Sequence, residues 1–472
     1  MQYVSTRGVA PVLDFTDVLL AGLARDGGLY VPASWPRLSY EEIAALAGRS
    51  YVDVATTVIA PFVAGALSPA DLRRHLTAAY AGFSHRAIAP LRQLGDDEWL
   101  LELFHGPTQS FKDYALQLLG RLFDDVLARR GQSVTIVGAT SGDTGSAAIE
   151  ACRDRPSMDV FILFPNGRVS EIQRRQMTTV ESANIHCIAV EGTFDDCQAL
   201  VKAMFDDHAF RDRHRLAAVN SINWGRIMAQ VVYYFTAALA LGAPARPVMF
   251  SVPTGNFGDV FAGYVAAQMG LPVAGLVVAT NINDILARFF ASGRYQPRGV
   301  VATTSPSMDI QVSSNFERLL FDLTGRDGRV VSGLMADLKS AGAFKVGDNV
   351  LAAASPLFTA ARIEEAEAAA TIAAEGRHGG VLLDPHSAIA VAAARKVKRT
   401  RGVPIVSLAT AHAAKFPDAV ARASGVRPTL PANMEGLLTR PERVTVLPND
   451  LDAVRRFVTG RARVSQPQRV PA

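Results

Sequence analysis

Lys112 is the residue of this chain whose setting best suits nucleophilic chemistry. It follows Phe111 in a segment rich in glycine and proline, His105-Gly-Pro-Thr-Gln-Ser-Phe-Lys-Asp113, and precedes an expected helix over residues 115–127. An amine beside an aromatic ring loses part of its hydration, which favours its neutral, nucleophilic form. A lysine at a helix start is also a common surface charge, so this segment alone leaves both interpretations open.

Three polar loops follow short apolar runs that have the character of strands. The loops are residues 138–145 after the run 133–137, residues 253–259 after the run 248–252, and residues 409–412 after the run 404–408. In open α/β sheets, ligands bind beyond the carboxyl ends of strands, where helix N-termini present unpaired N–H groups. The sequence therefore predicts one composite site built from these loops.

The turn Gly255-Asn256-Phe257-Gly258 predicts an anion site. Glycine lets the backbone fold tightly and approach a ligand, and successive N–H groups form a nest for negative charge. A strand-to-helix turn without a ligand is the alternative interpretation. The turn is neither Gly-x-Gly-x-x-Gly nor a Walker loop, and the chain contains no Gly-x-x-x-x-Gly-Lys-Ser/Thr, which disfavours a dinucleotide or nucleoside triphosphate site.

The loop Thr140-Ser141-Gly142-Asp143-Thr144 supplies hydroxyl and N–H groups suited to a carboxylate or a phosphate. Asp143 would repel an anion unless its carboxylate faces away or caps the helix that follows. Capping of that helix without any ligand also explains such a loop.

The elements that position these loops alternate between strands and helices. Near-continuous apolar runs separated by helical stretches are typical of parallel sheets covered on both faces. The first 95 residues instead indicate mostly helices, with apolar residues three and four apart, as in a helix over 69–80 that Ser68 caps. The apolar runs lie at 133–137, 160–164, 185–190, 248–252, 273–279 and 404–408.

Composition excludes several classes of protein. Lys plus Arg exceeds Asp plus Glu by only four (48 − 44), and the basic residues are scattered, so nucleic-acid binding is not expected. Three cysteines, Cys152, Cys187 and Cys197, favour a reducing cytoplasm over a secreted disulfide scaffold. The charged N-terminus does not fit a signal peptide, and the longest uncharged apolar run, 231–243, is too short to span a bilayer. We expect a soluble, cytoplasmic protein.

Taken together, the motifs resemble those of the long form of threonine synthase, in the same order along the chain. The resemblance covers about residues 1–420. Ala409 and Ala413 stand where that family usually has Gly and Pro, which leaves the setting of the loop around Thr410 open. Asp143 matches the long threonine synthases, whereas related enzymes often have Asn there. The matching segments are 3–8, 26–32, 105–113, 140–145, 220–223, 255–259, and 410–412 with 415–416.

The resemblance implies an enzyme that uses pyridoxal 5'-phosphate (PLP), with the tryptophan-synthase-β-like α/β fold of two open, mostly parallel sheets with helices on both faces and a mainly helical N-terminal segment. It would be a carbon–oxygen lyase that converts O-phospho-L-homoserine and water to L-threonine and phosphate. Lys112 would hold the cofactor and move protons, and Thr410 would bind the pyridine nitrogen. Gly255, Asn256, Phe257, Gly258 and Asp259 would bind the cofactor phosphate, and Thr140, Ser141, Gly142, Asp143 and Thr144 would bind the substrate carboxylate.

The substrate phosphate needs cationic partners, for which arginine and lysine are suited. Arg168, Arg226 and Lys415 are candidates because each lies in or beside a motif or a strand end, although a surface role is the alternative for each.

The resemblance also sets the expected organisation of the chain. The family is often monomeric, so a monomer or a weak homo-oligomer is expected. Four consecutive segments are expected: a helical N-terminal segment (1–95), a domain with Lys112 and the substrate loop (96–235), a domain with the phosphate loop (236–427), and an irregular tail (428–472) with a disordered end at 465–472.

Two rival functions stay open at this stage. A serine or threonine dehydratase, or an O-acetylserine sulfhydrylase, shares the fold, but such chains generally lack the N-terminal segment and the Ser5-Thr-Arg-Gly8 opening found here. A catalytically idle homologue that only binds a ligand is the rival of another class, and the retention of Lys112 argues against it.

Overall fold

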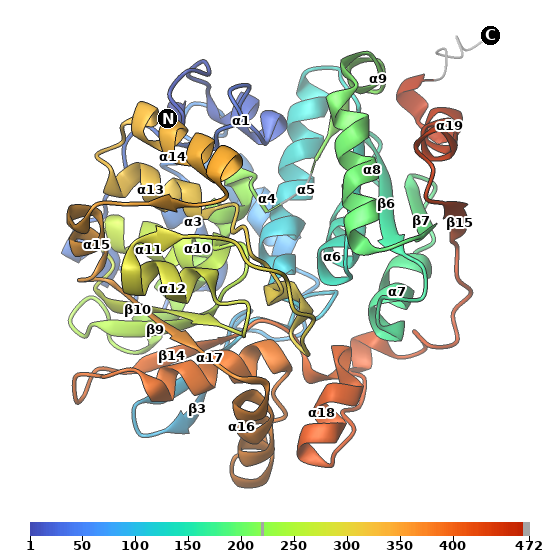
Figure 1. Ribbon diagram of the computed structural model, residues 1–472. Coiled ribbons are helices and arrows are strands. Elements are labelled where there is room, and N and C mark those ends of the chain that lie inside the picture. Colours follow the sequence, from blue (N-terminus) through green and yellow to red (C-terminus); the bar gives the residue numbers. More distant parts are fainter. Residues whose placement is uncertain (219–220, 466–472) are drawn as a thin grey trace. The chain divides into compact units, whose positions relative to one another are not determined.

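The computed structural model describes residues 1–218 and 221–465, and the chain forms two compact units. The first unit contains residues 1–19, 23–115 and 221–429, and the second contains the described parts of 20–22, 116–220 and 430–472. Each unit is built on a mostly parallel sheet with helices packed against it (Figure 1). The expected fold class is confirmed.

The first unit has a six-stranded sheet in the order β13-β10-β9-β14-β4-β3. All neighbours are parallel except β3, which pairs antiparallel with β4. Because β9 lies beside β14, the loops that follow these two strands leave the same edge of the sheet. The strands are β13 (Phe358–Arg362), β10 (Val273–Thr280), β9 (Val248–Pro253), β14 (Ile405–Ala409), β4 (Glu98–Glu102) and β3 (Leu91–Gly95).

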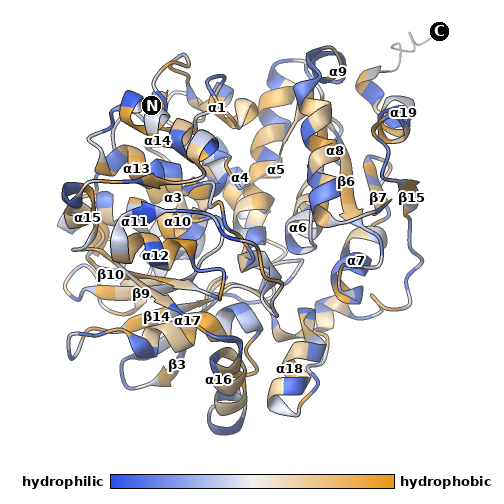
Figure 2. Cartoon of the chain, in the orientation of Figure 1, coloured by the Kyte–Doolittle hydropathy of each residue, from blue (hydrophilic) through white to orange (hydrophobic). Residues whose placement is uncertain are grey.

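Helices cover both faces of this sheet (Figure 1). On one face, α17 (Pro385–Lys396) packs against β9, β10 and β14; α16 (Glu365–His378) packs against α17, and α18 (Pro417–Ser424) packs against α16. On the other face, α11 (Gly258–Gln268) and α12 (Ile285–Ser292) contact the sheet, and α10 (Trp224–Ala240) packs on α11. Burial of both faces explains why these strands read as continuous apolar runs, visible as orange ribbon in Figure 2.

The N-terminal segment belongs to the first unit and is mainly helical, as expected. The predicted helix over 69–80 coincides with α4 (Pro69–Tyr80), where the Ser68 hydroxyl accepts the N–H of Asp71. The short antiparallel pair β1–β2 was not predicted, because a strand of three residues is too short to show an alternation of apolar and polar residues. The remaining elements of this unit are β1 (Tyr3–Ser5), α1 (Phe15–Ala21), β2 (Tyr30–Pro32), α2 (Tyr40–Ala44), α3 (Tyr51–Ile59), β11 (Arg294–Tyr295), α13 (Phe316–Leu323), α14 (Gly328–Ala341), β12 (Phe344–Lys345) and α15 (Asp348–Ala354).

The second unit has a five-stranded, all-parallel sheet in the order β15-β7-β6-β5-β8. Its core joins apolar side chains of β5, β6 and β7 to those of α8 and α19. The long helix α5 (Lys112–Arg129) begins in the first unit and continues in the second. The other elements are β5 (Val134–Ala139), α6 (Asp143–Cys152), β6 (Met158–Pro165), α7 (Glu171–Thr178), β7 (Ile185–Glu191), α8 (Phe194–Asp206), α9 (His208–His214), β8 (Leu216–Ala217), β15 (Thr445–Pro448) and α19 (Leu451–Arg461).

The two units do not coincide with the four consecutive segments expected from the sequence. Strand β4, at the start of the expected second segment, pairs with β14 from far along the chain, and Lys112 lies in the first unit. The tail from residue 428 is more regular than expected, because β15 pairs with β7 and α19 buries Val454 and Val458. The expected disorder at 465–472 concerns residues that, from 466 on, lie outside those described.

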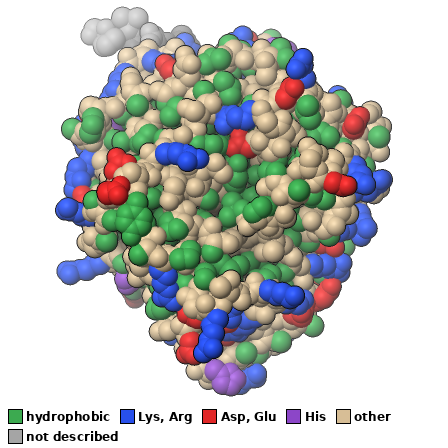
Figure 3. Space-filling model, turned by 90° about the vertical axis from the view of Figure 1, so that its left-hand side faces the viewer, with side chains coloured by type: hydrophobic (Ala, Val, Ile, Leu, Met, Phe, Trp, Pro, Cys, Tyr) green, Lys and Arg blue, Asp and Glu red, His purple; other side chains and the backbone are tan. Residues whose placement is uncertain are grey.

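Surface charge and apolar helices agree with the composition. Basic and acidic side chains are interspersed on the face shown in Figure 3. The apolar run 231–243 falls mostly within the buried helix α10. Within residues 1–218 and 221–465, no helix has both the length and the apolar character needed to cross a bilayer.

Candidate active site

Lys112 is the first residue of α5, and its side chain is buried. Its Nζ lies 5.2 Å from the centre of the Phe111 ring, which is the partly desolvated setting inferred from the sequence. The preceding loop is held by Asp113, whose carboxylate accepts the Thr108 N–H at 2.8 Å and the Thr108 hydroxyl at 2.7 Å. A side chain at Gly106 would collide with Asp113, since a Cβ there would lie 2.4 Å from that of Asp113. The loop therefore holds the lysine in a fixed place.

Lys415 stabilises this loop through a buried hydrogen bond. Its Nζ donates to the Thr108 carbonyl at 2.8 Å, and its side chain is fully buried. Burial raises the pKa of Asp113 to about 6, against the hydrogen bonds from Thr108 and the charge of Lys415, which lower it. This geometry favours a structural role for Lys415 over the expected contact with substrate phosphate.

The Thr410 loop pairs directly with the lysine loop. The Phe111 N–H donates to the Thr410 carbonyl at 2.9 Å, and the His412 N–H donates to the Gln109 carbonyl at 3.1 Å. Thr410 is buried at the carboxyl end of β14. The hydroxyl of Ser110, in the paired segment, is buried and has no hydrogen-bond partner within the described part of the chain. A buried hydroxyl without a partner so near Lys112 indicates a polar ligand here.

The departures from the family at residues 409 and 413 leave this loop intact. Ala409 and Ala413 are both buried and small, and the Ala409 carbonyl accepts the Leu103 N–H at 2.9 Å. Both alanines are therefore accommodated in a loop that keeps its backbone hydrogen bond to Leu103.

The turn after β9 presents its N–H groups at the start of α11. Phe257 has a φ of 64°, in the left-handed region, and its buried ring packs on Phe316 with centroids 5.1 Å apart. The N–H groups of Gly255, Asn256 and Gly258 donate to no other residue in the described ranges 1–218 and 221–465. Close approach requires glycine at 255, because a Cβ there would lie 2.5 Å from the Ser307 carbonyl oxygen. Unsatisfied N–H groups at a helix N-terminus form an anion site.

A second segment, residues 313–315, holds this turn in place. The Ser313 hydroxyl donates to the Gly255 carbonyl at 2.7 Å, and the Asn315 N–H donates to the Asn256 carbonyl at 3.0 Å. This segment was not predicted from the sequence, because it does not directly follow a strand-like run. The signal that could have revealed it is the polar run Ser313-Ser-Asn315 between apolar stretches.

The carboxylate of Asp259 faces away from the turn. It accepts the hydroxyls of Tyr233 at 2.5 Å and Tyr234 at 3.0 Å inside the helix packing. Burial raises its pKa to about 6, with the tyrosine hydrogen bonds acting in the opposite direction. These hydrogen bonds join α11 to α10, and the expected contact of Asp259 with the cofactor phosphate stays a prediction.

Arg226 lies in the first turn of α10 and is 4% exposed. Its guanidinium makes no hydrogen bond to any described residue, and Nη1 is buried without a partner. Burial lowers the pKa of Arg226 to about 10, partly offset by Tyr233. A buried cation without a partner is costly, which indicates that an anion binds here. Of the neighbouring motif 220–223, Asn220 lies outside the described residues, and Asn223 caps α10.

The Thr140 loop belongs to the second unit and begins α6. The Thr140 hydroxyl accepts the N–H groups of Gly142 at 3.0 Å and Gly145 at 2.9 Å. The Asp143 carboxylate accepts the Gln173 amide at 2.8 Å, so it is oriented by that side chain and does not cap α6. Gly142 has a φ of 142°, and a Cβ there would strike Gln173. Gln173 was missed by the sequence analysis, since nothing local links it to a loop 30 residues earlier.

Within this loop, the hydroxyl and N–H of Ser141 and the N–H of Thr144 have no partner among the residues that the structure describes. They remain available to a carboxylate at the start of α6. Arg168, in contrast, is exposed between β6 and α7. Its recorded interaction is with Asp196, whose pKa is lowered mainly by hydrogen bonds from Thr193 and further by Arg168.

In the first unit, these features combine into one chemical setting. A buried lysine, a nest of N–H groups at a helix start and a hydroxyl at the neighbouring strand end suit a phosphorylated carbonyl compound. The lysine would bind its carbonyl, the nest its phosphate and the hydroxyl a ring nitrogen.

Comparison with known proteins agrees with this setting. Three family models match the chain: "Threonine synthase N terminus" over residues 2–80, "Pyridoxal-phosphate dependent enzyme" over 85–411, and "Threonine synthase, C-terminal" over 387–458. The second model alone covers more than half of the chain and includes every candidate cofactor contact named above.

Individual relatives match over nearly the whole length. The threonine synthase of Pseudomonas aeruginosa is 58% identical over 468 residues, which is 99% of this chain and 100% of the relative. The crystal structure of PLP-bound threonine synthase from Brucella melitensis has 58% identity and a TM-score of 0.96, covering 98% of this chain and 100% of that one. The threonine synthase from yeast has 39% identity and a TM-score of 0.92, covering 97% and 98%.

Proposed function

The chain belongs to the threonine synthase family of pyridoxal-phosphate-dependent enzymes, and from this we propose that it converts O-phospho-L-homoserine and water to L-threonine and phosphate. The observation that carries the proposal is the combination of Lys112, the unsatisfied N–H groups at residues 255–258 and the buried Thr410 in one unit of a chain matched along nearly its whole length. The dehydratase and idle-homologue alternatives have no observation in their favour.

The residues of the first unit fit the cofactor. Lys112 would bind its carbonyl carbon, and the N–H groups of Gly255, Asn256, Phe257 and Gly258 would bind its phosphate. The hydroxyl of Thr410 would donate to the pyridine nitrogen. Because this partner is neutral, the nitrogen would stay unprotonated, which would moderate the electron withdrawal that a carboxylate partner would strengthen.

When bound, the cofactor stabilises negative charge at the substrate carbons next to the amine. The Lys112 amine would remove a proton from Cα. A second proton would leave Cβ as phosphate departs from Cγ, and Cγ would then take up a proton to become the methyl group. Water would add its hydroxyl to Cβ while Cα regains a proton. A buried amine suits this work, because partial desolvation favours its neutral form.

Arg226 binds the phosphate group of the substrate. Its buried guanidinium has no other partner among the described residues, and an arginine can hold phosphate in a bidentate manner. By stabilising the dianion, it also makes phosphate a better leaving group. The Thr140–Thr144 loop binds the substrate carboxylate through the Ser141 hydroxyl and the N–H groups at the start of α6.

The protein is proposed to work in the cytoplasm. The observation in support is that Cys152, Cys187 and Cys197 are buried free thiols. A monomer or weak homo-oligomer, the state expected for the family, stays a prediction.

The test is release of phosphate and threonine from O-phospho-L-homoserine by the wild type and by Lys112→Ala, assayed side by side. We expect equal amounts of the two products from the wild type. The variant should lose both the activity and the visible absorbance band of the cofactor.

Other outcomes would separate the alternatives. A wild type that carries the visible band but forms ammonia and a keto acid from serine or threonine would be a dehydratase. A wild type with the band and no turnover would be an idle homologue. A colourless protein, even after addition of PLP, would refute the cofactor assignment.

A further inference from the structure

Ser307 lies against the turn that is proposed to hold the cofactor phosphate. Its carbonyl oxygen is so near Gly255 that a Cβ at residue 255 would lie 2.5 Å from it. Ser307 belongs to the single-turn 3-10 helix η1 (Pro306–Met308), and a helix this short has little stability of its own. The position of this wall of the turn therefore depends on the groups that hold the backbone of Ser307.

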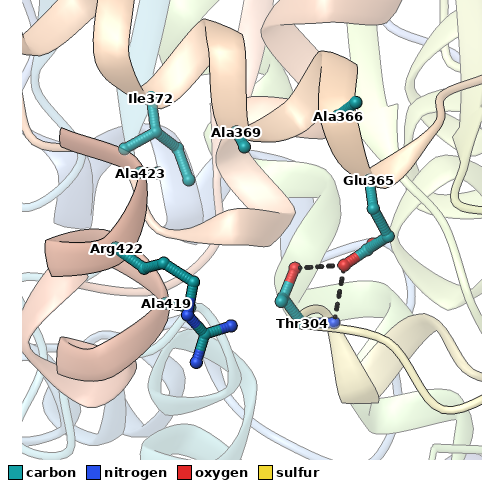
Figure 4. Close-up of a pocket in the computed structure, with 8 residues that line it drawn as sticks. All are labelled: Thr304, Glu365, Ala366, Ala369, Ile372, Ala419, Arg422 and Ala423. Carbon is teal, nitrogen blue, oxygen red and sulfur yellow. Dashed lines mark hydrogen bonds between the residues drawn. The ribbon is translucent and has the colours of Figure 1, made fainter.

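Polar side chains hold the residues on either side of Ser307. Thr304 donates to Oε2 of Glu365, the first residue of α16, through its hydroxyl at 2.8 Å and its N–H at 3.1 Å, as the dashed lines in Figure 4 show. Asp309 accepts the Thr303 hydroxyl at 2.6 Å and the Thr303 N–H at 2.9 Å. These bonds fix both ends of the segment 303–309 and leave its middle, at Ser307, to be held by another group.

The side chain of His386, in the first turn of α17, accepts the Ser307 N–H. The distance from that nitrogen to Nε2 is 3.3 Å, and His386 is 3% exposed. On the other side of the ring, Nδ1 lies 2.7 Å from a carboxylate oxygen of Asp384, the residue that caps α17. Since a backbone N–H can only donate, Nε2 carries no proton, and the proton on Nδ1 is donated to Asp384. The carboxylate thus fixes the tautomer that the bond from Ser307 requires.

Asp384 and His386 are themselves fixed to the sheet of the first unit. Asp384 is 1% exposed, and its carboxylate also accepts the N–H groups of His386 at 3.0 Å and of Ser387 at 3.2 Å, together with the Ser387 hydroxyl. The helix that Asp384 caps, α17, packs against β9, β10 and β14. Because β9 is followed directly by the Gly255 turn, His386 links Ser307 to the same sheet that carries the turn.

We propose that His386 is a positioning residue for the cofactor phosphate, a proposal that rests on the assignment of residues 255–258 to that group. By accepting the Ser307 N–H, His386 holds the Ser307 carbonyl against Gly255, and the turn that contains Gly255 keeps one conformation. A nest of N–H groups binds an anion best when those groups are oriented before the anion arrives. Without His386, the Ser307 peptide can withdraw and the turn can spread, so the phosphate binds less tightly.

The experiment measures retention of PLP by equilibrium dialysis of the holoenzyme and its variants. His386→Asn keeps an amide beside Asp384 but is too short to reach Ser307, and His386→Met keeps apolar bulk beside the Phe416 ring without a strong acceptor. We expect each change to weaken retention about fivefold, as for the loss of one neutral hydrogen bond. His386→Gln places an amide oxygen near the position of Nε2 and should stay within about twofold of the wild type.

A double-mutant cycle with Gly255→Ala separates this role from a merely structural one. In the wild-type background, the new Cβ meets a carbonyl that His386 holds in place, so retention should fall at least about tenfold. Once His386→Asn or His386→Met has released Ser307, the carbonyl can withdraw, and Gly255→Ala should cost less than about threefold. The matched control is Ser387→Ala, which removes a bond to Asp384 at the same helix start but keeps the contact with Ser307. In this background, Gly255→Ala should again cost at least about tenfold.

The phosphorus-31 resonance of bound PLP gives a second reading. It should shift in His386→Asn and His386→Met and stay unchanged in His386→Gln and Ser387→Ala. The proposal is overturned if both His386→Asn and His386→Met retain PLP as the wild type does, or if their effects simply add to that of Gly255→Ala. Normal retention by Gly255→Ala alone would refute the assignment of the turn and this proposal with it. Threonine formation by the wild type depends on neither outcome, so failure of the proposed function is detected separately.

Discussion

Replacing Arg226 with methionine is expected to stabilise the protein while it disables the enzyme. Burial lowers the pKa of this guanidinium from 12.5 to about 10, a difference of about 2.5 (12.5 − 10). At about 1.36 kcal/mol per pKa unit, the charged form in the folded state is disfavoured by roughly 3 kcal/mol. Since the folded-state pKa is lowered, this penalty is fully present at every pH below about 10 and is relieved only as the pH rises through that value.

Methionine keeps much of the apolar stem and removes the charge, so we expect the free energy of unfolding at pH 7 to rise by about 1–3 kcal/mol. Urea unfolding of the apoprotein, followed by circular dichroism, measures this change through the midpoint. In the wild type, inorganic phosphate should raise the midpoint by binding to the guanidinium, whereas in Arg226→Met it should have a smaller effect.

Whereas stability should increase, the catalytic efficiency of Arg226→Met should decrease. Removing one partner of a buried ion pair costs about 3–5 kcal/mol, so kcat/KM for O-phospho-L-homoserine should fall by about two to four orders of magnitude. The control is Arg168→Met, whose exposed side chain should change stability by less than about 0.5 kcal/mol and leave kcat/KM unchanged. A less stable Arg226→Met with normal kcat/KM would show that the guanidinium has a partner within the protein, and the assignment would be wrong.

Three other substitutions test the cofactor site. Gly255→Ala should weaken retention of PLP at least about tenfold, because the added Cβ would meet the Ser307 carbonyl at 2.5 Å, whereas Gly258→Ala, with its nearest contact at 3.4 Å, should retain it; equilibrium dialysis compares the two. Thr410→Val should lower kcat by about tenfold and shift the visible band, while Thr410→Ser preserves both; a normal band in the valine variant would argue against a bond to the ring nitrogen. Asp259→Asn should raise the thermal midpoint at pH 8 by relieving up to roughly 3 kcal/mol, since burial raises the pKa of Asp259 to about 6. The cost of burying the charged carboxylate is full above about pH 6 and disappears below about pH 4. An equal rise of the thermal midpoint at pH 5 and at pH 8 would contradict this explanation.

The sequence predicts that the cofactor loops lie close together, but it does not predict the order of the strands that carry them. Apolar runs at 248–252 and 404–408 identify buried parallel strands, and loops at the carboxyl ends of such strands meet at one edge. This is why the Gly255 turn and Thr410 could be assigned to one site without knowledge of strand order. The strand order itself depends on pairing between distant segments, as for β4 with β14, and no local pattern encodes it.

The groups that a side chain contacts could not be predicted from the sequence either. Lys415 and Arg226 are both cations beside motifs, yet one donates to the Thr108 carbonyl while the other has no described partner. Spacing along the chain cannot distinguish them, because the difference arises from which groups the fold brings within 3 Å. Asp143 shows the same limit, since its partner Gln173 lies on another helix.

Asn315 joins two parts of the first unit that handle different phosphate groups. Its amide donates to the Asn256 carbonyl and to the Ser221 carbonyl, each at 3.1 Å. The first carbonyl belongs to the turn proposed to hold the cofactor phosphate, which stays in every cycle. The second lies five residues before Arg226, which is proposed to hold the substrate phosphate that must depart. On this proposal, one short side chain sets the spacing between the permanent anion and the transient one. Evolution of this enzyme toward a longer or shorter substrate would therefore have to change residue 315 before either anion site could move alone.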